Sequence, residues 1–219
     1  MTELILKGLL SYLLGSIVGS LLIARLTGGV DIRTLGSGNA GATNALRHLG
    51  KGTALLVLLI DVAKGFIATR FVAAWALPAV AVAASDLAPW AVTVCGLAVM
   101  LGHVYPLWYG FRGGKGFATL VGALLGIKLW LLWPMALVWF GTAILTGYVS
   151  LASMLGAVAV AVAMALCKGR EGQPPFVTYG VLSALLVIYT HRSNIARLRA
   201  GTESRARRLW LLGTRRNQS

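Results

Sequence analysis

Charged residues are scarce in this chain of 219 residues, since they make up only 12% of it and only six of them are acidic. A soluble domain carries roughly 25% charged residues. Hydrophobic residues account for 58% of the chain, and the mean hydropathy is +0.79. This composition excludes a soluble globular domain and indicates an integral membrane protein.

Cysteine is nearly absent as well. Cys95 and Cys167 both lie inside apolar stretches, with neither a pairing framework nor metal-ligand spacing around them. Histidine, aspartate and glutamate show no metal-ligand constellation either. We expect two buried thiols, no metal and no cofactor.

No cleavable signal peptide is expected at the N-terminus. The apolar stretch from Leu4 to about Ala24 is followed by no small-residue cleavage site, so we expect an uncleaved helix. The net charge of +14 would suggest a nucleic-acid partner in a soluble protein. Here the apolar stretches leave no soluble domain to carry such a face, so we expect no nucleic-acid binding.

Long apolar stretches are abundant. A membrane-spanning helix needs about 20 apolar residues. Seven stretches are predicted to span the membrane: Leu4–Leu26, Thr53–Ala74, Leu87–Pro106, Phe117–Trp133, Met135–Val149, Leu151–Cys167 and Pro175–His191. The stretch from Phe117 to Thr146 is interrupted only by Lys128 and Pro134, and it suits either one kinked helix or two short ones.

The distribution of lysine and arginine favours two short helices. With seven spans, fourteen of these residues fall in the loops near Gly36 and Gly114 and in the tail after His191, against five on the other face. Positive charge is retained in the cytoplasm. We therefore predict an all-α membrane protein with a periplasmic N-terminus and a cytoplasmic C-terminus. Residues 1–219 form one membrane-embedded domain in this prediction, and 192–219 are its basic cytoplasmic tail.

The first glycine-rich stretch runs from Leu35 to Arg47. It matches the pattern GxGxxG, and Asp61 follows twenty residues after Gly41, as in a dinucleotide site. Such a site needs a strand before the glycines and a second strand carrying the acid. Asp61 instead lies in an apolar stretch, which excludes a dinucleotide site. A simple interhelical turn remains an alternative, but the number of polar groups favours one wall of a phosphate site.

The second glycine-rich stretch runs from Gly102 to Thr119. It resembles a P-loop, but the spacing from Gly110 is wrong and Gly116 follows Lys115 where a serine or threonine should stand. A glycine turn at the start of a helix still offers N–H groups, the positive end of the helix dipole and a lysine to an anion. The alternative is an ordinary turn at the membrane edge.

Two further groups of polar residues stand out. Asp61 and Lys64 are three residues apart, so they share a helical face and can neutralise each other. Ionisable groups at that depth are functional candidates, although a structural ion pair fits equally well. His191, Asn194 and Arg197 repeat at intervals of three and line one helical face. The other arginines of the tail follow from the positive-inside rule and lipid contacts.

These clusters suit a phosphorylated ligand meeting an apolar one, which is the chemistry of lipid headgroups. No histidine is followed by aspartate after four residues, a pattern associated with thioester-dependent acyltransferases, and no nucleophile stands out. If the chain transfers an acyl group, its donor must then be a molecule that is already chemically activated.

The motifs SGNAGATN with Arg47, DVAKG, GHVYP followed by FRGGKGFAT, and HRSNIARLRAGTE occur in this order. They resemble the bacterial acyl-phosphate-dependent glycerol-3-phosphate acyltransferases, the PlsY family. The resemblance covers Gly36 to Glu203. It implies a seven-helix enzyme of the bacterial inner membrane with its site on the cytoplasmic face. It also implies transfer of an acyl group from acyl phosphate to the 1-hydroxyl of sn-glycerol 3-phosphate, giving lysophosphatidic acid and phosphate in the first acylation of phospholipid synthesis.

The resemblance also implies roles for individual residues. The groups expected to act in catalysis are Ser37, Lys115, His191 and Asn194. Those expected to bind substrate are Gly38, Asn39, Gly41, Thr43, Asn44, Arg47, Lys64, His103, Gly113, Gly114, Gly116, Thr119, Ser150 and Arg197.

The expected partners are acyl phosphate and glycerol 3-phosphate as substrates and the membrane lipids, with no obligate protein partner. Which glycine turn holds which phosphate stays open at this point. A small transporter for a phosphorylated metabolite and a structural lipid-binding protein are the alternatives. Transporters place their sites near the midplane between repeats, whereas these polar residues gather at one face.

Overall fold

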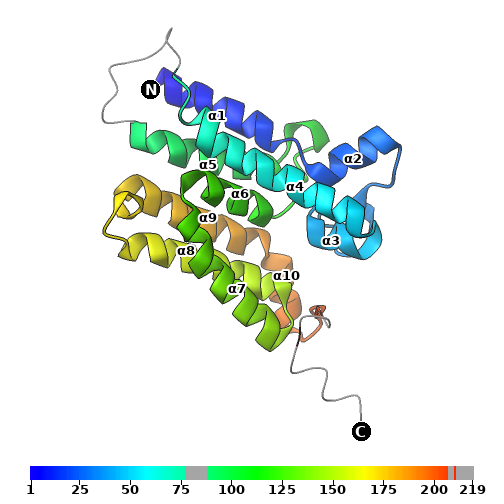
Figure 1. Ribbon diagram of the computed structural model, residues 1–219. Coiled ribbons are helices and arrows are strands. Elements are labelled where there is room, and N and C mark those ends of the chain that lie inside the picture. Colours follow the sequence, from blue (N-terminus) through cyan, green and yellow to red (C-terminus); the bar gives the residue numbers. More distant parts are fainter. Residues whose placement is uncertain (77–87, 207–209, 211–219) are drawn as a thin grey trace. The chain divides into compact units, whose positions relative to one another are not determined.

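The computed structural model describes residues 1–76, 88–206 and 210. Within these residues every regular element is a helix (Figure 1). The α-helices are α1 (Thr2–Gly15), α2 (Gly19–Thr27), α3 (Ala42–His48), α4 (Lys51–Ile67), α5 (Ala88–Val104), α6 (Phe117–Ile127), α7 (Leu132–Thr146), α8 (Val149–Leu166), α9 (Pro174–Thr190) and α10 (Arg192–Arg199). The short turns are the 3₁₀-helices η1 (Ile32–Thr34), η3 (Leu107–Tyr109), η4 (Leu129–Leu131) and η5 (Arg170–Gly172) and the π-helix η2 (Ala68–Val72).

The chain divides into two compact units, residues 1–129 and residues 130–219. Leu87, where the third span was expected to begin, lies outside the described residues. So do four arginines of the basic tail: Arg207, Arg208, Arg215 and Arg216.

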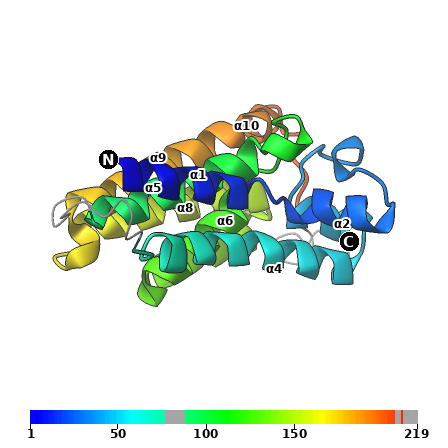
Figure 2. The same cartoon turned by 90° about the horizontal axis from the view of Figure 1, so that it is seen from above.

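Residues 1–129 are built on two pairs of helices, α1 against α5 and α4 against α6 (Figures 1 and 2). Glycine lets their backbones meet. A Cβ atom at Gly15 would overlap the backbone of Val99, and one at Gly122 would overlap the backbone of Val62. Such close packing at small residues is usual where helices meet in a membrane.

The first apolar stretch is broken into α1 and α2, which are bent by 53°. A break leaves backbone groups without helical partners. Lys64 Nζ donates to the carbonyl oxygens of Gly15 at 2.9 Å and Ile17 at 2.8 Å, and Asp61 Oδ1 accepts from the N–H of Gly19 at 3.2 Å. The positive charge of Lys64 therefore lies at the C-terminal end of α1 and the negative charge of Asp61 at the N-terminal end of α2, as the helix dipoles favour.

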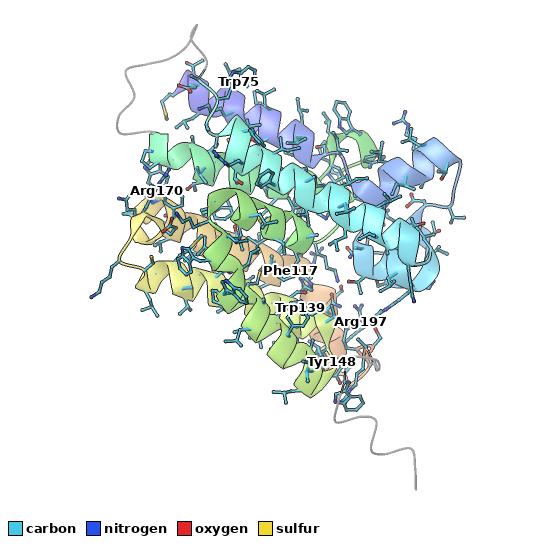
Figure 3. The ribbon with its side chains drawn as sticks, viewed as in Figure 1. Trp75, Phe117, Trp139, Tyr148, Arg170 and Arg197 are labelled. Carbon is cyan, nitrogen blue, oxygen red and sulfur yellow. The ribbon has the colours of Figure 1, made fainter. Side chains whose placement is uncertain are left out.

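In residues 130–219, α8 packs between α7 and α9. Gly156 brings α8 close to Met135 of α7, and the indole of Trp139 donates to Ser153 at 3.3 Å. Figure 3 labels Trp139 on α7. Turn residues Gly147 and Tyr148 connect α7 to α8.

The stretch from 117 to 146 contains two helices, as the charge distribution predicted, but the predicted break at Pro134 is wrong. Helix α6 ends at Ile127, and α7 begins at Leu132. Pro134 lies in the first turn of α7, where the missing N–H of proline has no helical acceptor to lose. The interruption instead lies at Lys128, whose backbone is extended.

Three described helical stretches are long and apolar enough to cross a membrane: Pro89–Tyr109, Leu129–Thr146 and Val149–Leu166. The bent pair α1 and α2 would make a fourth if it is one span. Helices α6 and α9 are apolar but shorter. The composition and these helices agree with an integral membrane protein.

Candidate active site

Asn44 organises the first glycine loop from helix α3. Its side-chain nitrogen donates to the carbonyl oxygens of Ile32, Leu35 and Asn39 at 3.2, 2.9 and 3.1 Å. Its side-chain oxygen accepts from the N–H of Ser37 at 3.3 Å. The side chain is buried and is used to hold the loop, so Asn44 shapes the backbone around the exposed Ser37.

Glycine is required at Gly36 and Gly38 because both have positive φ, +54° and +68°. A Cβ at Gly36 would also overlap the ring of His48. Thr43 and Arg47 are four residues apart on α3, so they share a helical face, and both are exposed. The half-buried Asn39 and Gly41 complete this loop before α3 begins.

The second glycine loop folds back on the end of α5. The N–H groups of Gly113 and Gly114 donate to the carbonyl oxygens of Val104 and His103, both at 3.0 Å. Carbonyls in the last turn of a helix lack helical partners, so these bonds end α5. A Cβ at Gly114 would overlap the His103 ring. These glycines are therefore required by close approach, and their N–H groups are already used within the chain.

Helix α6 begins directly after this loop. Gly116 precedes it with φ +82°, and Lys115 is half-buried beside it. The N–H groups of the first helical turn have no helical acceptors. Thr119 Oγ1 is buried in this turn and has no hydrogen-bond partner among the described residues. This turn therefore retains groups that can bind an anion.

Asp61, Lys64 and His103 form a buried polar cluster between α4 and α5, with side chains at most 3% exposed. Lys64 Nζ lies 3.1 Å from Asp61 Oδ1 and 2.8 Å from His103 Nδ1. The expected ion pair of Asp61 and Lys64 is thus present. A lysine ammonium has three protons, and the contacts of Lys64 to this pair and to the break between α1 and α2 engage all of them.

In residues 130–219, the carboxylate of Glu203 contacts three polar side chains. Glu203 Oε1 accepts from Ser150 Oγ at 2.7 Å and from Asn194 Nδ2 at 2.6 Å, and Oε2 accepts from Arg197 Nε at 2.7 Å. Burial raises the pKa of Glu203, but these three hydrogen bonds and the charge of Arg197 outweigh it and hold the pKa below its ordinary value. Glu203 is therefore ionised at neutral pH.

The turn after α10 brings Glu203 to its partners. The N–H of Thr202 donates to the carbonyl of Arg197 at 2.9 Å, and that of Gly201 donates to Leu198 at 3.2 Å. Gly201 has φ +70°. These features define a Schellman motif, which ends a helix and reverses the chain.

His191 lies between α9 and α10 and is buried. Its Nδ1 is 2.7 Å from the carbonyl oxygen of Val187. A carbonyl only accepts, so Nδ1 carries a proton, and in the neutral ring Nε2 is the acceptor. The imidazole therefore has a defined tautomer.

One sequence interpretation is wrong here. The predicted spans Met135–Val149 and Leu151–Cys167 leave Ser150 in a turn between helices, but it lies in the first turn of α8, since Val149 already begins that helix. The structure also shows contacts of Arg205 in the basic tail, whose guanidinium lies over the ring of Tyr148 at 4.7 Å and over that of Trp210 at 4.0 Å. Figure 3 labels Tyr148 near this end of α8.

The predicted site residues thus fall in both units. The two glycine loops and the cluster of Lys64 and His103 lie in residues 1–129, and His191 and the partners of Glu203 lie in residues 130–219. Sequence reasoning gave no role to Glu203, although it is an acid that follows a run of arginines, which was the available signal. No group of three or more His, Cys, Asp or Glu in residues 1–76, 88–206 and 210 could hold a metal ion.

The fold and these clusters define a helical integral membrane protein whose glycine turns and basic residues suit phosphate groups. The family described as "Glycerol-3-phosphate acyltransferase" matches residues 5–201. The chain belongs to this family.

Similar proteins carry the same name as this family. A glycerol-3-phosphate acyltransferase of Synechococcus sp. (strain JA-3-3Ab) is 42% identical over 211 residues, covering 94% of this chain and 95% of the relative. Another, of Laribacter hongkongensis, is 43% identical over 198 residues, covering 90% and 92%.

A solved structure is similar as well. The crystal structure of PlsY (YgiH), an integral membrane glycerol 3-phosphate acyltransferase, in its glycerol 3-phosphate form is 36% identical. The match has a TM-score of 0.80 and covers 92% of this chain and 94% of that one. The lysophosphatidic acid form of the same protein matches with a TM-score of 0.77.

Proposed function

We propose that this chain transfers a fatty acyl group from acyl phosphate to the 1-hydroxyl of sn-glycerol 3-phosphate and releases lysophosphatidic acid and phosphate. The observation that carries the proposal is the likeness, over 92% of the chain, to a glycerol 3-phosphate acyltransferase solved in its glycerol 3-phosphate form. The acyl phosphate donor rests on the motif resemblance and on the chemistry below.

The reaction needs little from the protein. The 1-hydroxyl oxygen bonds to the acyl carbonyl carbon, the bond from that carbon to the phosphate oxygen breaks, and phosphate leaves with its electron pair. The hydroxyl proton goes to a phosphate oxygen. Because the donor is a mixed anhydride with a good leaving group, the protein has to align the hydroxyl and stabilise the developing negative charge.

Each polar cluster has a proposed part. In residues 1–129, Ser37, Asn39, Arg47 and Lys115 bind phosphate, and the start of α6 adds N–H groups and the Thr119 hydroxyl, which is buried without a partner among the described residues. In residues 130–219, His191, Asn194, Arg197 and Ser150 bind glycerol 3-phosphate. Glu203, which contacts the last three of these, holds them in place.

The topology is also proposed here. We infer seven spans in one membrane-embedded domain, with a periplasmic N-terminus and the basic loops and tail in the cytoplasm. The fourteen-to-five distribution of lysine and arginine supports this orientation. Together with the resemblance to the bacterial PlsY family, it supports an enzyme of the bacterial inner membrane whose substrates arrive from the cytoplasm.

Purified protein supplied with acyl phosphate and glycerol 3-phosphate tests the function, with phosphate release and lysophosphatidic acid both measured. Acyl-CoA in place of acyl phosphate should give no product. A transporter is the second possibility, because the helix broken between α1 and α2 is a feature of transporters. Uptake of glycerol 3-phosphate into vesicles without phosphate release would establish the transporter and refute the enzyme.

A further inference from the structure

Arg33 on η1 contacts the second glycine loop. Its Nη1 donates to the carbonyl oxygens of Tyr109 at 2.8 Å and Arg112 at 2.9 Å. Arg112 directly precedes Gly113, and Arg33 itself stands three residues before Gly36. One side chain at the entrance of the first glycine loop therefore holds both ends of the turn that leads into the second.

Asp31 fixes the orientation of this side chain. Its carboxylate accepts from Arg33 Nε at 3.0 Å and from Nη2 at 2.7 Å, and Asp31 Oδ1 also accepts from the backbone N–H of Arg33 at 2.9 Å. The hydrogen bonds from Arg33 lower the pKa of Asp31. The planar guanidinium can face a carboxylate on one edge and two carbonyls on another, whereas a lysine ammonium cannot.

The turn that Arg33 holds has an unfavourable backbone. Gly110 has φ +65° and Phe111 has φ +57°, and Phe111 is the one residue other than glycine with positive φ among those the structure describes. A left-handed conformation is costly for a residue with a Cβ and persists where its surroundings fix it. The bonds from Arg33 to the carbonyls on either side of these two residues provide such a constraint.

We propose that Arg33, oriented by Asp31, is a positioning residue that couples the two glycine loops and sets the conformation of residues 107–116. Its consequence for catalysis rests on the proposed function, because that function makes the loops the phosphate-binding elements. The coupling itself rests only on the contacts of Arg33.

The first test measures the coupling without activity. R33K keeps the positive charge but loses the planar guanidinium that contacts Asp31 and the two carbonyls together. R25K is the matched control because Arg25 is an exposed arginine of α2 outside these loops. Backbone hydrogen exchange in detergent-solubilised protein should become about tenfold faster in residues 107–116 of R33K, as expected for the loss of one charged hydrogen bond. Peptides from α8 and all peptides of R25K should exchange as in the wild type. Unchanged exchange in residues 107–116 of R33K would overturn the proposal.

The second test measures acyl transfer. R33K should lower kcat/KM for glycerol 3-phosphate about tenfold or more, because small displacements of binding groups are costly in catalysis, while R25K stays within about twofold. Millimolar guanidinium should restore part of the activity of R33A, and equal sodium chloride should not. Full activity of R33K together with faster exchange would show that the coupling does not position the loop for catalysis.

The two failures are separable. A wild-type protein without acyl transfer refutes the proposed function, while faster exchange in R33K would still support the coupling. If R33K does not yield monodisperse protein, D31N is measured in the same two ways. Faster exchange of residues 107–116 in D31N supports the coupling, and unchanged exchange refutes it.

Discussion

Replacing Lys64 by methionine tests the buried polar cluster most directly. The variant keeps an unbranched side chain. It removes the Lys64 ammonium, which in the wild type lies 3.1 Å from the fully buried Asp61 carboxylate. At an effective dielectric constant of about 20, two unit charges at that distance attract by about 5 kcal/mol. Removing one partner of a buried ion pair costs about 3–5 kcal/mol. We expect K64M to lower the free energy of unfolding by about 3–5 kcal/mol.

Part of this cost arises at the break between α1 and α2. In K64M the carbonyl oxygens of Gly15 and Ile17 lose the ammonium that they accept from. Each buried acceptor left unpaired costs about 1–3 kcal/mol where water cannot replace the donor. The bond to Ile17 is only partly buried, whereas the bond to Gly15 is buried, so the surroundings compensate for part of the loss at Ile17 and the lower end of the range applies to its carbonyl.

Unfolding of the purified protein in mixed micelles provides the assay, with the fraction folded followed by circular dichroism. A63M is the control because Ala63 is an exposed neighbour on α4, and it should be within about 0.5 kcal/mol of wild type. The double variant D61L/K64M removes both charges and should be more stable than K64M alone, since an apolar pair often replaces a buried ion pair without loss. Equal stability of K64M and the double variant would refute the reasoning.

Three further predictions concern the loops and the tail. G114A places a Cβ against the His103 ring and should abolish most acyl transfer. The control G52A, whose added Cβ meets nothing within 4 Å, should keep its activity. Equal activity of the two variants would contradict the close approach of Gly114 to His103. G201A should lower the free energy of unfolding by about 1–2 kcal/mol because Gly201 has a positive φ, while G141A in α7 should not lower it. Thermal unfolding in detergent measures both variants. A G201A variant as stable as the wild type would refute the Schellman turn. Because the pKa of Glu203 lies below the ordinary value of 4.5, its stabilisation is complete at neutral pH and is lost as the pH falls below about 4.5. Unfolding measured as a function of pH should therefore show a steeper loss of stability at acid pH in the wild type than in E203Q. Parallel pH dependences of the two proteins would refute an ionised Glu203 that stabilises the fold.

Much of the fold followed from the sequence because apolar length and charge distribution are directly visible in it. The positions of breaks were harder. Pro134 is a strong helix breaker in isolation, but its place in a helix depends on where the helix begins, and the chain begins α7 at Leu132. The break between α1 and α2 was not predicted, because Lys64 and Asp61, which satisfy it, lie more than 40 residues away.

The candidate site shows the same limit. Sequence patterns identified the glycine loops, because few other residues tolerate positive φ. They could not separate a glycine needed for an open N–H from one needed for close approach, as at Gly113 and Gly114, where the N–H groups end α5. Glu203 and Arg33 were counted only as charges, because their partners become apparent only when the chain is folded. Whether the predicted residues bind substrate stays a prediction.

The broken first helix also affects the order in which the chain can mature during synthesis. Gly15 and Ile17 depend on a lysine that lies 49 and 47 residues further along the chain. Until α4 leaves the ribosome, their carbonyls need water or lipid headgroups as partners, because unpaired backbone groups are costly in hydrocarbon. The break in the N-terminal segment must therefore stay in contact with water or headgroups until α4 arrives, and arrival of Lys64 allows it to be buried.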